Sequence, residues 1–167
     1  MLRVALPVLS IAACWKWGNW KNWREYYPTF LYAIIGDLAY NLVFFNHMLW
    51  RYEKFINHTG SDIFNAFLVF PFITIIVFSH WPKGLLKQSL YVLIWSIGLS
   101  VVEYGSILLR YFSHHHDWNI FWSFVVYVGT FLLMRLHYKH PLIVWPVSAA
   151  FAAITALLFK LPFDAIK

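Results

Sequence analysis

Charged residues are scarce in this chain, and their scarcity excludes most classes of soluble protein. Asp, Glu, Lys and Arg together make up 12% of the 167 residues, whereas soluble domains carry about 25%. A water-soluble fold of this length would have too little polar surface to cover its core. The composition therefore indicates a membrane protein.

Cysteine and the motifs of familiar catalytic sites are also nearly or wholly missing. The one cysteine, Cys14, excludes an intramolecular disulfide and a cysteine-based zinc cluster. The sequence has no glycine-rich phosphate loop, no His-Glu-x-x-His helix and no nucleophile elbow. We therefore expect no enzymatic activity and no cofactor, and an intramembrane enzyme is the least favoured alternative.

Apolar residues dominate what is present. Hydrophobic residues make up 61% of the chain and the mean hydropathy is +0.60. Five apolar stretches reach the about 20 residues that a membrane-spanning helix needs, and they lack the alternation of a membrane barrel. We predict an all-α fold, a polytopic transmembrane helical bundle that forms one integral membrane domain over residues 1–167. It has five full spans plus a short N-terminal helix over residues 1–15. The predicted spans are residues 29–50, 63–81, 90–109, 118–136 and 141–161.

An aromatic and basic segment over residues 15–28 follows the short first helix. Tryptophan beside lysine and arginine is typical of an element that lies in the headgroup layer. An aromatic cage for a cationic ligand is the alternative. The predicted interfacial anchor residues are Trp15, Trp17, Trp20, Trp23, Lys16, Lys21 and Arg24.

The residues just before this segment allow a second interpretation of the N-terminal stretch. Ile11-Ala12-Ala13-Cys14 is similar to a lipoprotein cleavage box, in which Cys14 would carry a lipid. A retained first helix is the favoured interpretation.

The net charge of +6 does not indicate nucleic acid, because the basic residues lie mostly between apolar stretches. Membrane lipids with anionic headgroups are the expected partner. Segments 15–28, 81–89 and 135–140 should share one side of the membrane and hold seven Lys and Arg residues, against six on the other side. A difference of one does not fix orientation by the positive-inside rule, but the density of segment 15–28 favours the cytoplasm for that side.

Two carboxylates inside predicted spans are the best clue to a functional site. Asp37 lies in span 29–50 and Glu103 in span 90–109. A charge at membrane depth costs roughly 2.5–3.5 kcal/mol, so such residues face other helices, water or a ligand. Asn41 shares a helix face with Asp37, and Tyr40 lies alongside. The simpler alternative is that Asp37 only fixes helix packing through a hydrogen bond.

Serines extend the polar pattern around Glu103. Ser96, Ser100, Glu103 and Ser106 are spaced 4, 3 and 3 residues apart, which traces one stripe along a helix. Such a stripe can line a hydrated cavity or form a buried seam. The candidate intramembrane polar site comprises Asp37, Tyr40, Asn41, Ser96, Ser100, Glu103 and Ser106.

A run of three histidines is a weak candidate for metal binding. His114, His115, His116 and Asp117 are consecutive, and adjacent residues on a helix point in different directions. The favoured interpretation is a solvated interfacial loop, so no metal site is assigned.

Small residues recur along the last predicted span. Small side chains four residues apart let helices approach closely, either within the bundle or between two copies in a homo-oligomer. These residues are Ser148, Ala149, Ala152, Ala153 and Ala156.

The first third of the chain has a distinctive order of aromatic and polar residues. The pattern is Trp20-Lys21-Asn22-Trp23-Arg24, Tyr26-Tyr27-Pro28-Thr29, Gly36-Asp37-Leu38-Ala39-Tyr40-Asn41 and Leu49-Trp50. It resembles a family of small multi-spanning membrane proteins of endospore-forming Bacillus-type bacteria. The resemblance implies a multi-pass location in the bacterial cytoplasmic membrane, and it implies no catalytic or binding residues.

The favoured functional hypothesis is an integral membrane protein that binds, senses or organises something at the cell membrane. The alternative is a transporter of a small molecule or ion, or a transporter subunit, with proton or cation coupling through Asp37 and Glu103. A continuous polar cavity that reaches either carboxylate would favour transport, whereas a dry seam would favour the first hypothesis.

Overall fold

Helices make up most of the structure, as the long apolar runs predict. The computed structural model describes residues 2–53 and 58–162. In chain order the elements are α1 (Leu2–Trp17), the short 3-10 helix η1 (Trp20–Asn22), α2 (Trp23–Val43), β1 (Trp50–Tyr52), α3 (His58–Leu68), α4 (Phe70–Ser79), α5 (Leu85–Leu108), β2 (Phe112–His114), α6 (Ile120–Lys139) and α7 (Val144–Leu158).

Three helices of the described chain are long and apolar enough to cross a membrane. The first is Thr59–Ser79, which comprises α3 and α4 together. The other two are Leu85–Leu108 and Ile120–Lys139, which are α5 and α6. The helical prediction is confirmed, but five full spans are not supported. The 15 residues of α7 rise only about 22 Å, less than the about 30 Å of a bilayer core. α2 has 21 residues, but its tyrosines, Asp37 and Asn41 lower its hydropathy.

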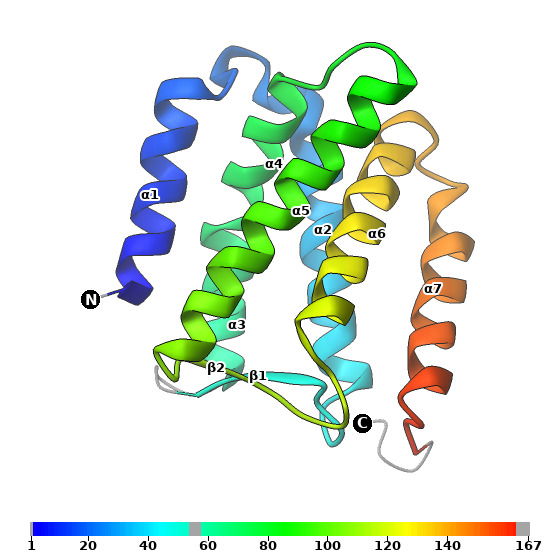
Figure 1. The fold of residues 1–167 in the computed structure, drawn as a ribbon. Helices are drawn as coiled ribbons and strands as arrows, with labels where there is room; N and C mark the ends of the chain where they lie inside the picture. The colour runs from blue at the N-terminus through cyan, green and yellow to red at the C-terminus, as the bar shows by residue number, and fades with distance from the viewer. Residues whose placement is uncertain (1, 54–57, 163–167) are drawn as a thin grey trace.

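The helices stand side by side, with α1 and α7 at the two outer edges (Figure 1). α2 packs against α4 and α6, α1 against α4, and α5 against α6. α7 packs against α6 alongside Gly129, where a Cβ atom would meet the Phe151 ring at 3.0 Å. Only a glycine lets the two helices approach this closely without displacing that ring.

The small residues of α7 divide between two environments. The Ser148 hydroxyl hydrogen-bonds the Tyr32 hydroxyl at 2.5 Å, and Ala156 packs into an apolar cluster. Ala149, Ala152 and Ala153 are exposed. Part of the stripe therefore packs within the chain, and the homo-oligomer expected through it stays a prediction.

A two-stranded antiparallel ribbon crosses one end of the bundle (Figure 1). Trp50 of β1 lies opposite His114 of β2, and Tyr52 lies opposite Phe112. We call this end, which holds β1 and β2, the ribbon end. The opposite end, formed by residues 18–22, 80–84 and 140–143, is the loop end.

The ribbon corrects the prediction that a helix continues to Trp50. α2 stops at Val43, and the Tyr40 hydroxyl accepts hydrogen bonds from the N–H groups of Leu49 and Trp50 at 3.0 and 3.4 Å. The Tyr40 ring also stacks on the Trp50 ring, with 3.8 Å between centroids. The Tyr40 side chain of α2 thus binds the segment that follows the helix and positions the first residue of β1.

Candidate functional site

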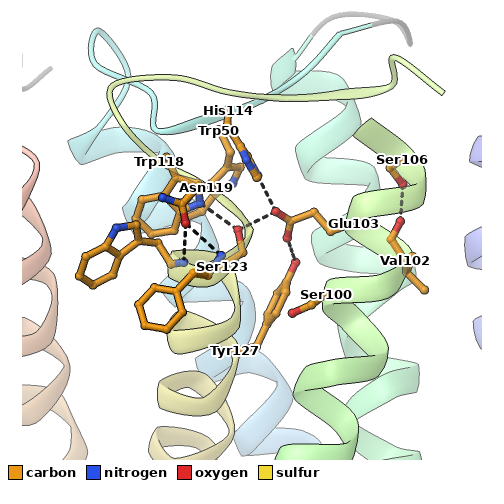
Figure 2. Close-up of polar contacts among 12 residues, drawn as sticks. Trp50, Ser100, Val102, Glu103, Ser106, His114, Trp118, Asn119, Ser123 and Tyr127 are labelled. Atoms are coloured by element: carbon orange, nitrogen blue, oxygen red, sulfur yellow. Dashed lines mark hydrogen bonds and ion pairs between the residues drawn. The ribbon is translucent and has the colours of Figure 1, made fainter. Parts of the chain in front are cut away.

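Glu103 is the centre of a buried hydrogen-bonded cluster at the ribbon end (Figure 2). The residue is on α5 and is 6% exposed. His114 Nε2 lies 2.6 Å from Glu103 Oε1, and the Ser123 hydroxyl donates to the same oxygen at 2.6 Å. The Tyr127 hydroxyl donates to Oε2. One carboxylate therefore joins α5, β2 and α6.

The chemistry of His114 and Glu103 determines which atom donates and which accepts the hydrogen bond between them. An ionised carboxylate can only accept hydrogen bonds, so Nε2 of His114 carries the proton in this contact. Because the contact is also an ion pair when His114 is protonated, it is strongest when the ring is charged and Glu103 is ionised.

The start of α6 places the two hydroxyl donors. The Asn119 side chain caps this helix by accepting hydrogen bonds from the N–H groups of Phe121 and Trp122 at 3.0 and 3.4 Å. Ser123 and Tyr127, four residues apart, then lie on one helix face towards α5 (Figure 2). Trp118 supports the first of them, because its Nε1 donates to the Ser123 hydroxyl at 2.9 Å.

Asp37 does not meet Glu103; it pairs with Asp62 of α3. The two carboxyl groups lie close enough to interact, and because two ionised carboxylates in contact repel, this arrangement favours a proton shared between them. The Asn41 amide donates to Asp62 Oδ2 and to the Asp37 backbone carbonyl, the latter at 3.0 Å. Within the described chain, Oδ2 of Asp37 is buried and has no hydrogen-bond partner.

Tyr52 of β1 connects the two acidic groups. Burial raises the pKa of its hydroxyl, and the negative charges of Asp37, Asp62 and Glu103 raise it further. All three carboxyl groups are therefore close enough to act on one phenol. The Asn65 side chain lies close to the same hydroxyl and lowers its pKa. The two clusters form one acidic region beneath the ribbon.

The predicted serine stripe does not form a single site. The Ser100 hydroxyl donates to the Ser96 carbonyl and the Ser106 hydroxyl to the Val102 carbonyl, both at 2.9 Å. These bonds lie within α5 itself. Ser96 is fully buried, and its hydroxyl has no partner among the described residues. Glu103 is the member of the stripe that contacts side chains of other elements.

The three consecutive histidines turn to three different partners. His114 contacts Glu103, His115 Nε2 lies 2.9 Å from the Ser113 hydroxyl, and the His116 ring stacks on His47 with 3.6 Å between centroids. Burial and the nearby His47 and His115 lower the pKa of His116. Over residues 2–53 and 58–162, no three His, Cys, Asp or Glu side chains are arranged to hold a metal ion.

The predicted interfacial anchor is split among three elements at the loop end. Trp15, Lys16 and Trp17 end α1, Trp20 and Lys21 lie in η1, and Trp23 and Arg24 begin α2. Trp15 is 79% exposed, whereas Trp20 packs edge-on against Phe72. The Lys16 ammonium lies 5.1 Å from the Trp17 ring centroid.

Cys14 lies inside α1 and is fully buried. A Cβ atom added at Gly18 would lie 2.5 Å from the Cys14 carbonyl oxygen and 2.7 Å from its sulfur. The chain therefore turns tightly over the Cys14 thiol at the end of α1. Lipidation of Cys14 stays an alternative, and it would require this part of the fold to open.

Several residues of the acidic region were not singled out by the sequence. Asp62 lies one residue before the predicted span 63–81. Ser123 and Tyr127 lie within the predicted span 118–136, and their spacing of four residues matches a polar helix face. The missed residues are Tyr52, Asp62, Asn65, Ser123 and Tyr127.

No family model matches this chain, and no curated protein or solved structure matches it. The resemblance to the Bacillus-type family therefore stays a prediction, and the function has to be argued from the geometry of the acidic region.

Proposed function

We propose that this chain is a multi-pass protein of the bacterial cytoplasmic membrane that works without catalysis, as a sensor of protonation at the ribbon end. The contact between His114 and Glu103 carries the proposal. It joins a ribbon outside the helices to a carboxylate buried among them, and both groups change charge when protons bind.

The arrangement of the helices supports a membrane location with more spans than the three longest helices. α2 packs against two of the three candidate spans, Thr59–Ser79 and Ile120–Lys139, and α7 packs against the second of these two. Large apolar side chains are exposed along the length of α5, as on a surface that faces lipid. They include Leu86, Leu90, Ile94, Ile97, Val101 and Leu108.

The carboxylate of Glu103 explains how protonation would act on the ribbon. As an anion it accepts hydrogen bonds from His114, Ser123 and Tyr127 together. A protonated carboxyl group has an O–H donor in place of one acceptor. The ribbon is therefore held most tightly when the His114 ring is charged and Glu103 is ionised, and protonation of Glu103 itself weakens the contact.

A spin label on the ribbon tests this proposal. Arg51 is exposed in β1, and the native Cys14 is buried, so an Arg51→Cys variant in nanodiscs can be labelled selectively. Because histidine is the side chain that gains its charge in this range, we expect label mobility to fall as the pH falls from 8 to 5. In an Arg51→Cys, Glu103→Gln double variant, mobility should not depend on pH. A label that is equally immobile at both pH values in the otherwise native chain would contradict the proposal.

Proton-coupled or cation-coupled transport is the second candidate, and the contact between Asp37 and Asp62 favours it. Two carboxyl groups that share a proton can exchange it for a cation. Uptake into vesicles that contain the protein should depend on pH and be lost in Asp37→Asn. Against this candidate, the two pockets described below lie at the loop end and reach neither Asp37 nor Glu103.

A further inference from the structure

The loop end has an open pocket with the opposite electrostatic character from the acidic region. Its volume is about 480 Å³, and it lies between the end of α4, the start of α5 and the last turn of α6. The residues that line it are Phe78, Trp81, Pro82, Lys83, Gly84, Gln88, Arg135 and Tyr138.

We propose that this pocket binds a phosphate group, either the headgroup of a phospholipid or a free phosphate ion. Lys83 and Arg135 supply two positive charges, and over residues 2–53 and 58–162 neither forms an ion pair. Arginine and lysine are the side chains that most often bind phosphate oxygens.

Two buried donors at the pocket have no acceptor in the described chain. They are Nε1 of Trp81 and Nε of Arg135. The Arg135 guanidinium lies 5.0 Å from the centroid of the Trp81 ring, so the two donors belong to one cluster. A buried N–H without a partner is costly, and a phosphate oxygen that reached this cluster would remove that cost.

The start of α5 adds a third source of positive potential. Gly84, at φ +91°, precedes the helix, and the first turn has no acidic residue. The unpaired N–H groups of a helix of 24 residues favour an anion at this point. One N–H of the Gln88 side-chain amide is already engaged, because it donates to the Pro82 carbonyl at 3.1 Å.

The one acidic side chain of the adjoining pocket is already engaged. That pocket shares Tyr138 with the first, and the Glu25 carboxylate in it accepts a hydrogen bond from the Tyr138 hydroxyl. Leu85 and Leu86, which follow the lining residue Gly84 in the chain, are 84% and 74% exposed. These leucines offer a path for acyl chains beside a bound headgroup.

Thermal unfolding of the purified full-length chain in a neutral detergent tests the proposal with defined probes. One arm titrates inorganic phosphate at constant ionic strength. The other titrates dioleoyl-phosphatidylglycerol against dioleoylglycerol, which has the same acyl chains and no phosphate. Each probe that binds raises the midpoint temperature with its concentration, and the dependence yields an apparent Kd.

Three glutamine variants give the controls. Arg135→Gln and Lys83→Gln should each weaken the binding by about tenfold or more, the loss expected for a charged hydrogen bond. Lys87→Gln removes an exposed charge from the same first turn, outside the pocket lining, and should change the Kd less than about twofold. Lys83 lies in an exposed loop, so its variant stays informative if Arg135→Gln fails to fold.

The results of the two titrations distinguish a free phosphate ion from a phospholipid headgroup. Stabilisation by inorganic phosphate that is lost in the two pocket variants assigns a free phosphate site. Stabilisation by phosphatidylglycerol alone, with the same loss, assigns a headgroup site. The proposal is overturned if neither probe stabilises the native chain, if dioleoylglycerol stabilises it equally well, or if Lys87→Gln weakens binding as much as the pocket variants do.

Discussion

The two ends of the bundle differ in how they treat buried polar groups. At the ribbon end, both oxygens of Glu103 accept hydrogen bonds, and the Trp118 indole donates to Ser123. At the loop end, the Trp81 indole and Nε of Arg135 are buried without an acceptor in the described chain. The Glu103 cluster is closed by its own side chains, although Oδ2 of the nearby Asp37 has no partner in the described chain, whereas the loop end offers charge and donors to something else.

This difference separates a switch from a docking site. A buried network that satisfies its own members responds to protons, because a change of charge on one member changes the strength of its hydrogen bonds. A cluster that leaves donors unpaired gains stability when an anion arrives. The Glu103 cluster therefore fits a sensor, and the basic pocket fits the site of a ligand.

The largest expected loss of stability comes from removing the Glu103 carboxylate at the ribbon end. Glu103→Leu leaves the hydroxyls of Ser123 and Tyr127 and the ring of His114 without their acceptor. We expect the free energy of unfolding to fall by about 3 kcal/mol or more, measured by thermal or denaturant unfolding in detergent. Ser106→Ala is the matched control on the same helix, because its hydroxyl bonds only the Val102 carbonyl. An equal loss in both variants would remove the special role of Glu103.

The Asp37–Asp62 contact is expected to stabilise the ribbon end as well, by a smaller amount. Asp37→Leu removes the partner of Asp62 and should cost about 2 kcal/mol. Asp37→Asn should be tolerated, because an amide donates to the Asp62 carboxylate without a shared proton. Unfolding at pH 7 measures both. If Asp37→Leu is as stable as the native chain, Asp37 faces lipid or water and not the bundle.

A smaller difference in stability is expected between substitutions of one tryptophan at each end of the bundle. Trp118→Phe loses the hydrogen bond to the Ser123 hydroxyl, whereas Trp81→Phe removes a buried N–H that has no partner. In detergent without phosphate, Trp118→Phe should destabilise the protein by about 1 kcal/mol more than Trp81→Phe does. Equal losses in the two variants would mean that the ends do not differ in hydrogen bonding.

The sequence predicts helices and the importance of two carboxylates, because apolar runs and charges at membrane depth follow from local composition. It does not predict which groups pair. Asp62 and Tyr52 reach their partners through the packing of α2, α3 and the ribbon, which no local pattern encodes. The strands have three residues each, too few to show the alternation that marks a strand.

Tertiary contacts also decided the ends of α2. The apolar pattern continues past Val43, so the sequence favours a longer helix. The Tyr40 hydroxyl captures the N–H groups of Leu49 and Trp50 instead, and this contact across nine and ten residues has no signature in hydrophobic periodicity.

Hydrogen–deuterium exchange of the ribbon tests the central claim most directly, namely that Glu103 fastens β1 and β2 to the bundle. The amide of Glu53 donates to the Tyr111 carbonyl, and the amide of His115 donates to the Leu49 carbonyl. In Glu103→Gln at neutral pH, we predict that both amides exchange about tenfold faster or more than in the native chain. Exchange in α4 should stay unchanged. Ribbon amides that exchange at the native rate in this variant would contradict the account.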